Sequence, residues 1–151
     1  QPAPDHFNGI YWRSGLPKDQ SPDPISAGVM WLSPVLPMSG QACDKLLGII
    51  EPMLARYGFE PLVTFTSISP RALVCVISIY YDKKNPHQTA QASQCYDCLL
   101  DELIAAGYVP YRTSIHGMAK LRQQPGWFSE LLGQLKTTVD PHAILAPGRY
   151  V

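Results

Sequence analysis

Four short segments of the chain carry apolar residues in alternation or in an unbroken run, which is the pattern of β-strands. In chain order they are 27–34, 61–69, 72–81 and 108–112. The third segment is apolar almost throughout and is predicted to be a central strand covered on both faces. The turn signal Ser69-Pro70-Arg71 predicts that the second and third segments form a hairpin.

Between the first two strands, apolar residues recur at helical spacing from Ser39, which can cap a helix, to Tyr57. Gly58 suits the position just past the end of this helix. Pro52 lies inside it and is expected to bend it, because proline removes one backbone hydrogen bond. The predicted buried face consists of Ala42, Leu46, Ile49, Ile50, Met53 and Tyr57.

A second helix is predicted to begin at Asn85-Pro86, because asparagine caps helices well and proline suits the first helical position. It is expected to run to about Ala106, with Gly107 as its terminator. The predicted buried stripe consists of Ala92, Cys95, Leu99, Leu103 and Ala106.

The order strand, helix, strand, strand, helix, strand is that of the ferredoxin-like arrangement. The expected fold class is therefore α+β, with an antiparallel sheet, two helices on one face, and a C-terminal helical segment. The other face of the sheet, which carries Thr64 and Thr66, must then be solvated or covered by another domain. Pockets form preferentially at such interfaces.

The chain divides into three predicted parts. Residues 1–26 are rich in proline and are expected to be irregular. Residues 27–113 hold the ferredoxin-like unit. Residues 114–151 form a tail with a short helix weakened by Gly117 and a longer helix after Pro125-Gly126, and this tail is expected to pack on something outside the unit.

Composition narrows the classes of function. Of the 151 residues, 46% are hydrophobic and 16% are charged, well below the usual charged fraction of about 25%. A surface with so little charge suits a chain that packs on another domain or protein. The formal net charge is zero and no run is strongly basic, so nothing predicts nucleic-acid binding. No apolar run is long enough for a membrane span, and a soluble protein is expected, in the cytoplasm rather than the periplasm.

The four cysteines are Cys43, Cys75, Cys95 and Cys98. The last two form a CxxC motif, but no second CxxC and no pair of histidines at ligand spacing accompany it, so no metal site is predicted. Both fall in the middle of the second helix, whereas thiol redox chemistry favours a helix start. Buried or half-buried structural cysteines are therefore expected.

The stretch Tyr111-Arg112 follows the second helix and holds the strongest candidate chemistry. A phenol oxygen beside a guanidinium can bind an anion, especially a phenolate, because arginine keeps a fixed charge and a planar fork of donors. Residue types alone also allow a structural interpretation, in which the arginine is solvated or paired with an acidic residue.

Several motifs, in their order along the chain, carry a resemblance to a known family. They are Tyr11-Trp12-Arg13, Met30-Trp31-Leu32-Ser33-Pro34, Phe59-Glu60-Pro61 followed by Thr64-Phe65-Thr66, Tyr81-Asp82-Lys83-Lys84, Tyr111-Arg112-Thr113, and the segment from Val139 to Arg149. The chain resembles, over nearly its whole length, the C-terminal half of flavoproteins of the vanillyl-alcohol oxidase / p-cresol methylhydroxylase family. The N-terminal FAD-binding region of that family is absent, so a fragment or one piece of a cut protein, inactive alone, is expected.

The resemblance implies an activity. Members of the family oxidise para-substituted phenols, which bind as phenolates and lose a hydride from the benzylic carbon to FAD, giving a quinone methide. Residues 27–113 would be part of the substrate-binding cap domain, and residues 114–151 would return to the FAD-binding domain. The implied partners are a phenolic substrate, the missing FAD-binding domain, and a second copy or a cytochrome.

The resemblance also assigns site residues. Tyr111 and Arg112 would hold the phenolate oxygen, and Arg112 would also lie near the flavin. Arg149, in the tail, would be a further cofactor contact. The residues that would line the aromatic pocket are Trp31, Thr64 and Val76.

One position departs from the family pattern. Many members attach FAD covalently through a histidine or tyrosine, and Val29 stands at the matching position, so non-covalent FAD is expected. His116 is an alternative candidate for the attachment of FAD, although a structural or solvated histidine is the simpler interpretation.

A second class of function stays open: a non-catalytic ferredoxin-like module that binds a small ligand or a protein on its open sheet face. A Gly-rich flavin-binding region encoded upstream of Gln1 would favour the enzyme, and a start codon close to Gln1 would exclude it. The sequence leaves open which phenol is used, whether oxygen or a cytochrome accepts the electrons, and the oligomeric state.

Overall fold

The computed structural model describes residues 26–122 and 126–147. The predicted irregular segment 1–26 therefore lies almost wholly outside the described residues. The strands are β1 (Ala27–Leu32), β2 (Val35–Pro37), β3 (Leu62–Ser69) and β4 (Ala72–Asp82), and the helices are α2 (Gly40–Arg56), α3 (Pro86–Ala105), α4 (Ile115–Arg122) and α5 (Trp127–Val139).

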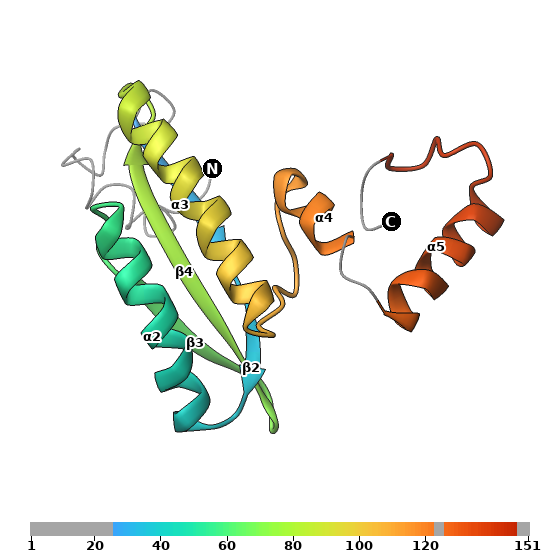
Figure 1. The fold of residues 1–151 in the computed structure, drawn as a ribbon, viewed down its shortest axis with the longest axis horizontal. Coiled ribbons are helices and arrows are strands. Elements are labelled where there is room, and N and C mark those ends of the chain that lie inside the picture. Colours follow the sequence, from blue (N-terminus) through green and yellow to red (C-terminus); the bar gives the residue numbers. More distant parts are fainter. Residues whose placement is uncertain (1–25, 123–125, 148–151) are drawn as a thin grey trace, which may run out of the picture.

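The sheet is antiparallel and is built around β4. This strand pairs with β1 and β2 along one edge and with β3 along the other. Helices α2 and α3 lie side by side on one face of the sheet (Figure 1). The predicted α+β class, the β3–β4 hairpin and the central position of 72–81 are thus confirmed.

Strands β1 and β2 are one strand interrupted at Ser33-Pro34. Leu32 faces Ile77 and Val35 faces Val74, so the register against β4 does not change across the break. Pro34 accepts a hydrogen bond from the Cys75 amide at 3.0 Å but has no N–H to donate in return. The ladder therefore loses one bond at this point.

The predicted strand 108–112 is reduced to a single bridge between Pro34 and Pro110. The Val35 amide donates to the Val109 carbonyl at 3.1 Å, and the Tyr111 amide donates to the Ser33 carbonyl at 3.2 Å. The segment takes the expected edge position, but Pro110 cannot donate and the chain soon turns into α4. Among the described residues, the outer edge of β1 consequently has no partner strand.

Local signals at the helix ends are confirmed. The side chains of Ser39 and Asn85 accept backbone hydrogen bonds at the starts of α2 and α3. Gly58 and Gly107 have φ angles of 74° and 83° just past the two ends, a region that glycine enters without strain. Helix α2 continues through Pro52 without interruption.

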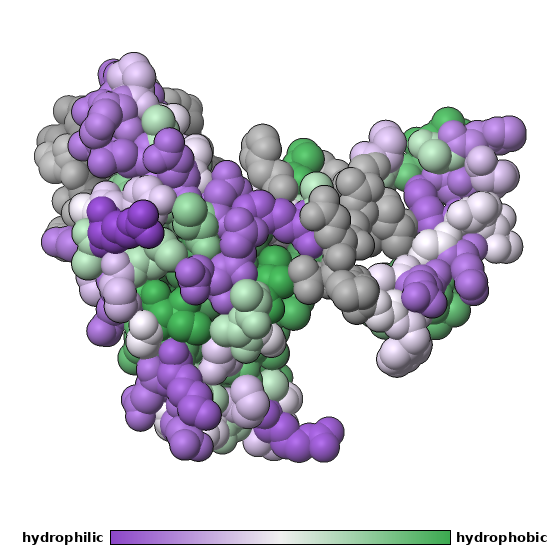
Figure 2. Space-filling model, in the orientation of Figure 1, coloured by the Kyte–Doolittle hydropathy of each residue, from purple (hydrophilic) through white to green (hydrophobic). Residues whose placement is uncertain are grey.

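The core lies between the sheet and the two helices, and its members differ slightly from the predicted set. Leu54 is fully buried, since it continues the spacing of Leu46 and Ile50 along α2. Ala106 is exposed, because it is the residue that caps α3 beyond the last turn. Apolar surface shows between the mostly polar outer sides of the helices (Figure 2).

All four cysteines are free thiols. Cys75 and Cys95 are buried in the core, and burial raises the pKa of the first to about 12 and of the second to about 11. No group of residues in the described ranges could hold a metal ion. Cys75 and Cys95 therefore stay neutral near physiological pH and act as core side chains, as the sequence predicts.

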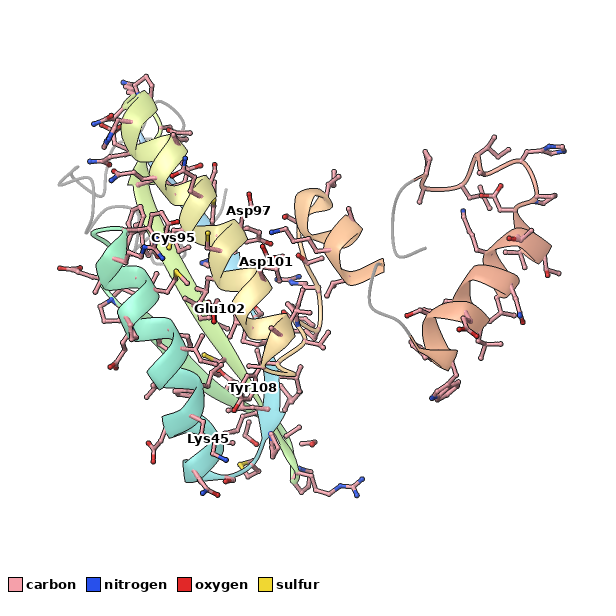
Figure 3. All side chains as sticks on the ribbon, viewed as in Figure 1. Lys45, Cys95, Asp97, Asp101, Glu102 and Tyr108 are labelled. Carbon is pink, nitrogen blue, oxygen red and sulfur yellow. The ribbon has the colours of Figure 1, made fainter. Side chains whose placement is uncertain are left out.

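The two C-terminal helices differ in how they are held. Lys120 of α4 reaches α3, with its Nζ 2.8 Å from Asp101 and 3.5 Å from Asp97, and both carboxylates lie on the side of α3 that faces α4 (Figure 3). Helix α5 has no buried residue and lies apart from the sheet (Figure 1). None of the helices in the described part of the chain is long and apolar enough to cross a membrane.

Asp140 organises the turn that follows α5. Its carboxylate accepts hydrogen bonds from the amides of Ile144 and Leu145 at 3.0 and 2.9 Å, and it pairs with Lys136. The bond from Lys136, followed by the two backbone bonds, holds the pKa of Asp140 below its ordinary value.

The core predicts a large effect of truncation at Leu99. This side chain is fully buried in α3, so Leu99→Ala should lower the free energy of unfolding by about 2–5 kcal/mol. Gln94→Ala, at an exposed position of the same helix, is the matched control and should change little. The measurement is urea denaturation of the wild type and the two variants. Equal midpoints would contradict the burial of Leu99 in the core.

The thiols predict an order of chemical labelling. At mildly alkaline pH, an alkylating reagent should modify half-buried Cys43 and Cys98 before Cys75 and Cys95, because burial restricts access and disfavours the thiolate. Mass spectrometry of peptides after timed labelling gives the four rates. In concentrated urea the difference should vanish, and early labelling of Cys75 in the folded protein would argue against the arrangement.

Candidate functional site

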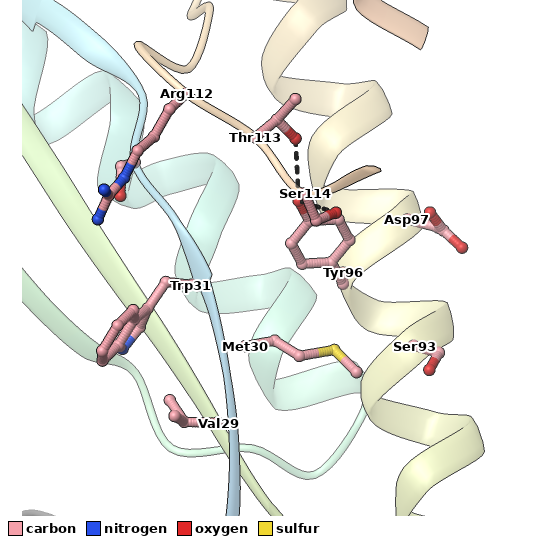
Figure 4. Close-up of a pocket in the computed structure, with 10 residues that line it drawn as sticks. Val29, Met30, Trp31, Ser93, Tyr96, Asp97, Arg112, Thr113 and Ser114 are labelled. Carbon is pink, nitrogen blue, oxygen red and sulfur yellow. Dashed lines mark hydrogen bonds between the residues drawn. The ribbon is translucent and has the colours of Figure 1, made fainter. Parts of the chain in front are cut away.

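A cavity of about 470 Å³ lies at the unpaired outer edge of β1. It is lined by Val29, Met30, Trp31, Ser33, Ser93, Tyr96, Asp97, Arg112, Thr113 and Ser114. Val29, Trp31 and Arg112 lie on one side of β1, and Met30 and Tyr96 lie on the other (Figure 4). The cavity therefore reaches around the strand edge, from the open sheet face to α3.

Tyr111 and Arg112 stand where the chain leaves the sheet. The guanidinium carbon of Arg112 is 5.3 Å from the centroid of the Tyr111 ring, and both residues are exposed, Tyr111 at 54%. Across residues 26–122 and 126–147, Arg112 forms no ion pair with a carboxylate. The structural interpretation that pairs this arginine with an acidic residue is not what the described chain shows.

The strand register brings two of the predicted pocket residues, Thr64 and Val76, onto the same open face. Thr64 faces Val76 across β3 and β4, and the continuous register of β1 and β2 places Ser33 opposite Val76 on the other side. Because directly opposed residues project from the same face, these residues form one row. The bridge at Pro34 adds Tyr111 opposite Ser33 to that row.

Trp31 belongs to the next row, where it faces Ser78. It is 56% exposed, and it lines the cavity beside Arg112 (Figure 4). Of the predicted pocket residues, Trp31 lines the cavity, while Thr64 and Val76 lie further across the open face. Arg149 lies outside the described residues.

The open face combines three kinds of group in one place. It has a fixed positive charge in Arg112, aromatic rings in Trp31 and Tyr111, and the hydroxyls of Ser33 and Thr64. A planar aromatic molecule with an anionic oxygen would match this set, because the charge can face the oxygen while the rings contact its faces.

Sequence reasoning did not single out Tyr96, although it is central to the cavity. It is 6% exposed and points from α3 toward the segment after Arg112. Its phenol oxygen lies 3.0 Å from Thr113 Oγ1 and 3.1 Å from Ser114 Oγ. The available signal was its place at the border of the apolar stripe of α3, beside Cys95 and Leu99, but its partners come from another element.

Comparison with curated proteins finds relatives over nearly the whole chain. The sequence is 32% identical over 151 residues to 1'-carboxy-chondrochloren decarboxylase from Chondromyces crocatus, covering 99% of this chain and 28% of the relative. It is 34% identical over 143 residues to the flavoprotein subunit of 4-cresol dehydrogenase [hydroxylating] from Pseudomonas putida, covering 93% of this chain and 25% of that protein. The chain thus spans about a quarter of the length of these relatives. No model of a protein family matches it.

Solved structures agree with the fold. A crystal structure of p-cresol methylhydroxylase with bound substrate matches with a TM-score of 0.75 and 35% identity, covering 82% of this chain and 24% of that one. A 4-ethylphenol oxidase from Gulosibacter chungangensis, in complex with isoeugenol, matches with a TM-score of 0.73 and 21% identity, over 83% of this chain and 24% of that one. At 21% identity, the second match supports the similarity of fold alone. The chain therefore belongs to the vanillyl-alcohol oxidase / p-cresol methylhydroxylase family of flavoproteins and corresponds to a C-terminal portion of its longer members.

Proposed function

We propose that this chain is part of an FAD-dependent oxidoreductase that oxidises para-substituted phenols, and that it supplies one wall of the phenol site. The observation that carries the proposal is Arg112 beside Tyr111, without a carboxylate partner in the described chain, at the edge of an open and largely apolar sheet face. Relatives named for 4-cresol and p-cresol, at 34% and 35% identity, support the substrate class.

The pair would act by favouring the ionised phenol. The Tyr111 hydroxyl and the Arg112 guanidinium would donate hydrogen bonds to the phenol oxygen, and the fixed positive charge would lower the pKa of the bound phenol. A phenolate releases a hydride from its benzylic carbon more readily than a phenol, because the oxygen supplies electron density to the ring. FAD, when bound, would supply the two-electron acceptor for this hydride, and addition of water to the resulting quinone methide would give the hydroxylated product.

The open face would orient the ring. Trp31 would contact the aromatic face, and Val76 with Thr64 would line the floor across the sheet. Donors fixed before the substrate arrives stabilise developing charge at little reorganisation cost.

The residues present fit a flavin that is bound without a covalent link from this wall. Arg112 is a cation at the cavity that could face a polar edge of the flavin ring, and Val29 lines the same cavity but has no nucleophilic atom. In this proposal the remaining flavin contacts come from an FAD-binding domain, with Arg149 as a further contact from the tail.

One relative is named a decarboxylase, which raises a second reaction type on this framework. A substrate carboxylate would call for a second cation near Arg112. The open-face residues in the rows that carry the predicted site are uncharged: Val29, Trp31, Ser33, Leu62, Thr64, Val76, Ser78 and Tyr80. This wall therefore favours phenol oxidation.

Replacement of the guanidinium tests the proposal. In the full-length protein, Arg112→Lys should lower phenol turnover by about 10²–10³-fold, because lysine keeps the charge but cannot reproduce the fork of donors. Arg71→Lys, in the exposed turn between β3 and β4, is the matched control. Turnover of a panel of para-substituted phenols with an artificial electron acceptor is the measurement, and an unaffected Arg112→Lys enzyme would remove Arg112 from the mechanism.

Acid denaturation tests the non-covalent flavin. When the full-length yellow protein is precipitated with acid, all of its flavin should stay in the supernatant, because Val29 offers no atom for a bond. Absorbance of the supernatant and of the washed pellet gives the partition. Flavin that remains with the polypeptide would contradict the proposal, and His116→Ala would then show whether His116 is the attachment point.

A colourless full-length protein that oxidises no phenol would instead favour the non-catalytic binding module. The same purified sample answers both questions, since bound flavin is visible before any substrate is added.

A further inference from the structure

Arg112 is flanked by two attachments that fix its backbone from opposite sides. On its N-terminal side, the Tyr111 amide donates to the Ser33 carbonyl at 3.2 Å and ties the chain to the sheet. On its C-terminal side, Thr113 and Ser114 both approach the phenol oxygen of Tyr96 on α3. The arginine is thus the one residue between a tie to the sheet and a tie to a helix.

The second attachment is part-buried and demands a specific geometry. Tyr96 has a single hydroxyl proton and two hydroxyl partners, so it can donate to one and must accept from the other. Its side chain is 6% exposed, and a buried hydroxyl that loses its partners costs free energy. The three hydroxyls therefore hold one another in place (Figure 4).

Helix α4 closes the attachment from the other side. Ser114 also accepts a hydrogen bond from the Gly117 amide at 3.4 Å, at the start of α4. A Cβ at position 117 would come within 2.1 Å of Thr113 Oγ1. Gly117, which weakens the helix as a sequence feature, is thus required for the close approach of α4 to Thr113.

We propose that Tyr96 is a positioning residue for Arg112. Its hydroxyl, through Thr113 and Ser114, sets where the guanidinium stands relative to the open sheet face and so sets how strongly the phenolate is stabilised. This inference rests on the proposed phenol oxidation, and it adds a residue on the helix side of the cavity that need not touch the substrate.

The role has a signature that simple support of the fold lacks. If Arg112 is displaced, the bound phenol is less stabilised as an anion and its pKa rises toward the free value of about 10. The kcat profile against pH reports ionisation in the enzyme–substrate complex. The increase of kcat with rising pH should therefore occur at higher pH when Tyr96 loses its hydroxyl.

The charged groups around the cavity do not explain the expected shift of the rising part of the kcat profile. Asp97 also lines the cavity, and it is paired with Lys120 of α4 at 3.5 Å. Arg112 and Tyr111 are both unchanged in every variant compared below, so neither residue accounts for a difference between the variants.

The test compares Tyr96→Phe with Tyr57→Phe in the full-length protein. Tyr57 is the matched control, since its hydroxyl also bridges to α3, 3.3 Å from Cys98 Sγ, yet Tyr57 does not line the cavity. With p-cresol or 4-ethylphenol as the probe, Tyr96→Phe should shift the kcat profile to higher pH by about one unit. At a given pH on the rising part of the profile, kcat should then be about tenfold lower. At the alkaline plateau, kcat should return toward that of the wild type.

Hydrogen exchange gives a readout that does not depend on activity. Amides of residues 112–118 should exchange faster in Tyr96→Phe than in Tyr57→Phe, because the segment loses its tie to α3. Gly117→Ala should produce the same two changes without touching Tyr96.

The outcomes separate the two proposals. Wild-type phenol turnover with a Tyr96→Phe profile identical to that of Tyr57→Phe would overturn the positioning role and leave phenol oxidation standing. A wild-type holoenzyme that oxidises no phenol would overturn phenol oxidation and, with it, the role of Tyr96 in that reaction. Faster exchange with an unshifted profile would show a purely structural bond and would also overturn the proposal.

Discussion

The backbone pairing at Pro34 is the constraint on which the candidate site depends. At this point β4 hydrogen-bonds to one side of the first strand and the segment around Pro110 hydrogen-bonds to the other. Proline at both bridge positions removes the donors that would extend the ladder. The last strand of the ferredoxin-like order is therefore held at one place and released immediately afterwards, so that Arg112 leaves the sheet and the edge of β1 stays open as a cavity.

Much of this fold can be predicted from local sequence signals, whereas contacts between elements that are distant in the sequence cannot. Asn85, Ser39 and Gly107 mark helix ends because each satisfies or permits a backbone geometry within a few residues of itself. The alternation along 61–69 places Thr64 on the open face by period alone. In contrast, the contact of Tyr96 with Thr113 joins α3 to the segment that follows Arg112, and no period or cap in either segment contains that information.

The same distinction applies to the site. Tyr111 and Arg112 could be named as an anion site from residue chemistry, and Trp31, Thr64 and Val76 from the family resemblance. The pairing of β1 and β3 with β4 determines that these residues share one face, and the prolines at the bridge determine that the final strand is short. Gly117 is the clearest case of a residue whose role could not be predicted from local sequence. It weakens the helix to which it belongs, but its lack of a side chain leaves room for Thr113.

Helix α5 has thirteen residues, a sustained apolar stripe and no buried side chain in the described structure. A helix of that length is marginal in water by itself, and its exposed stripe includes Trp127, Phe128, Leu131, Leu135 and Val139. Formation of this helix and burial of its stripe are consequently one coupled equilibrium. The population of folded α5 then follows mass action with whatever surface covers it, whereas the ferredoxin-like unit has a core of its own between the sheet and helices α2 and α3.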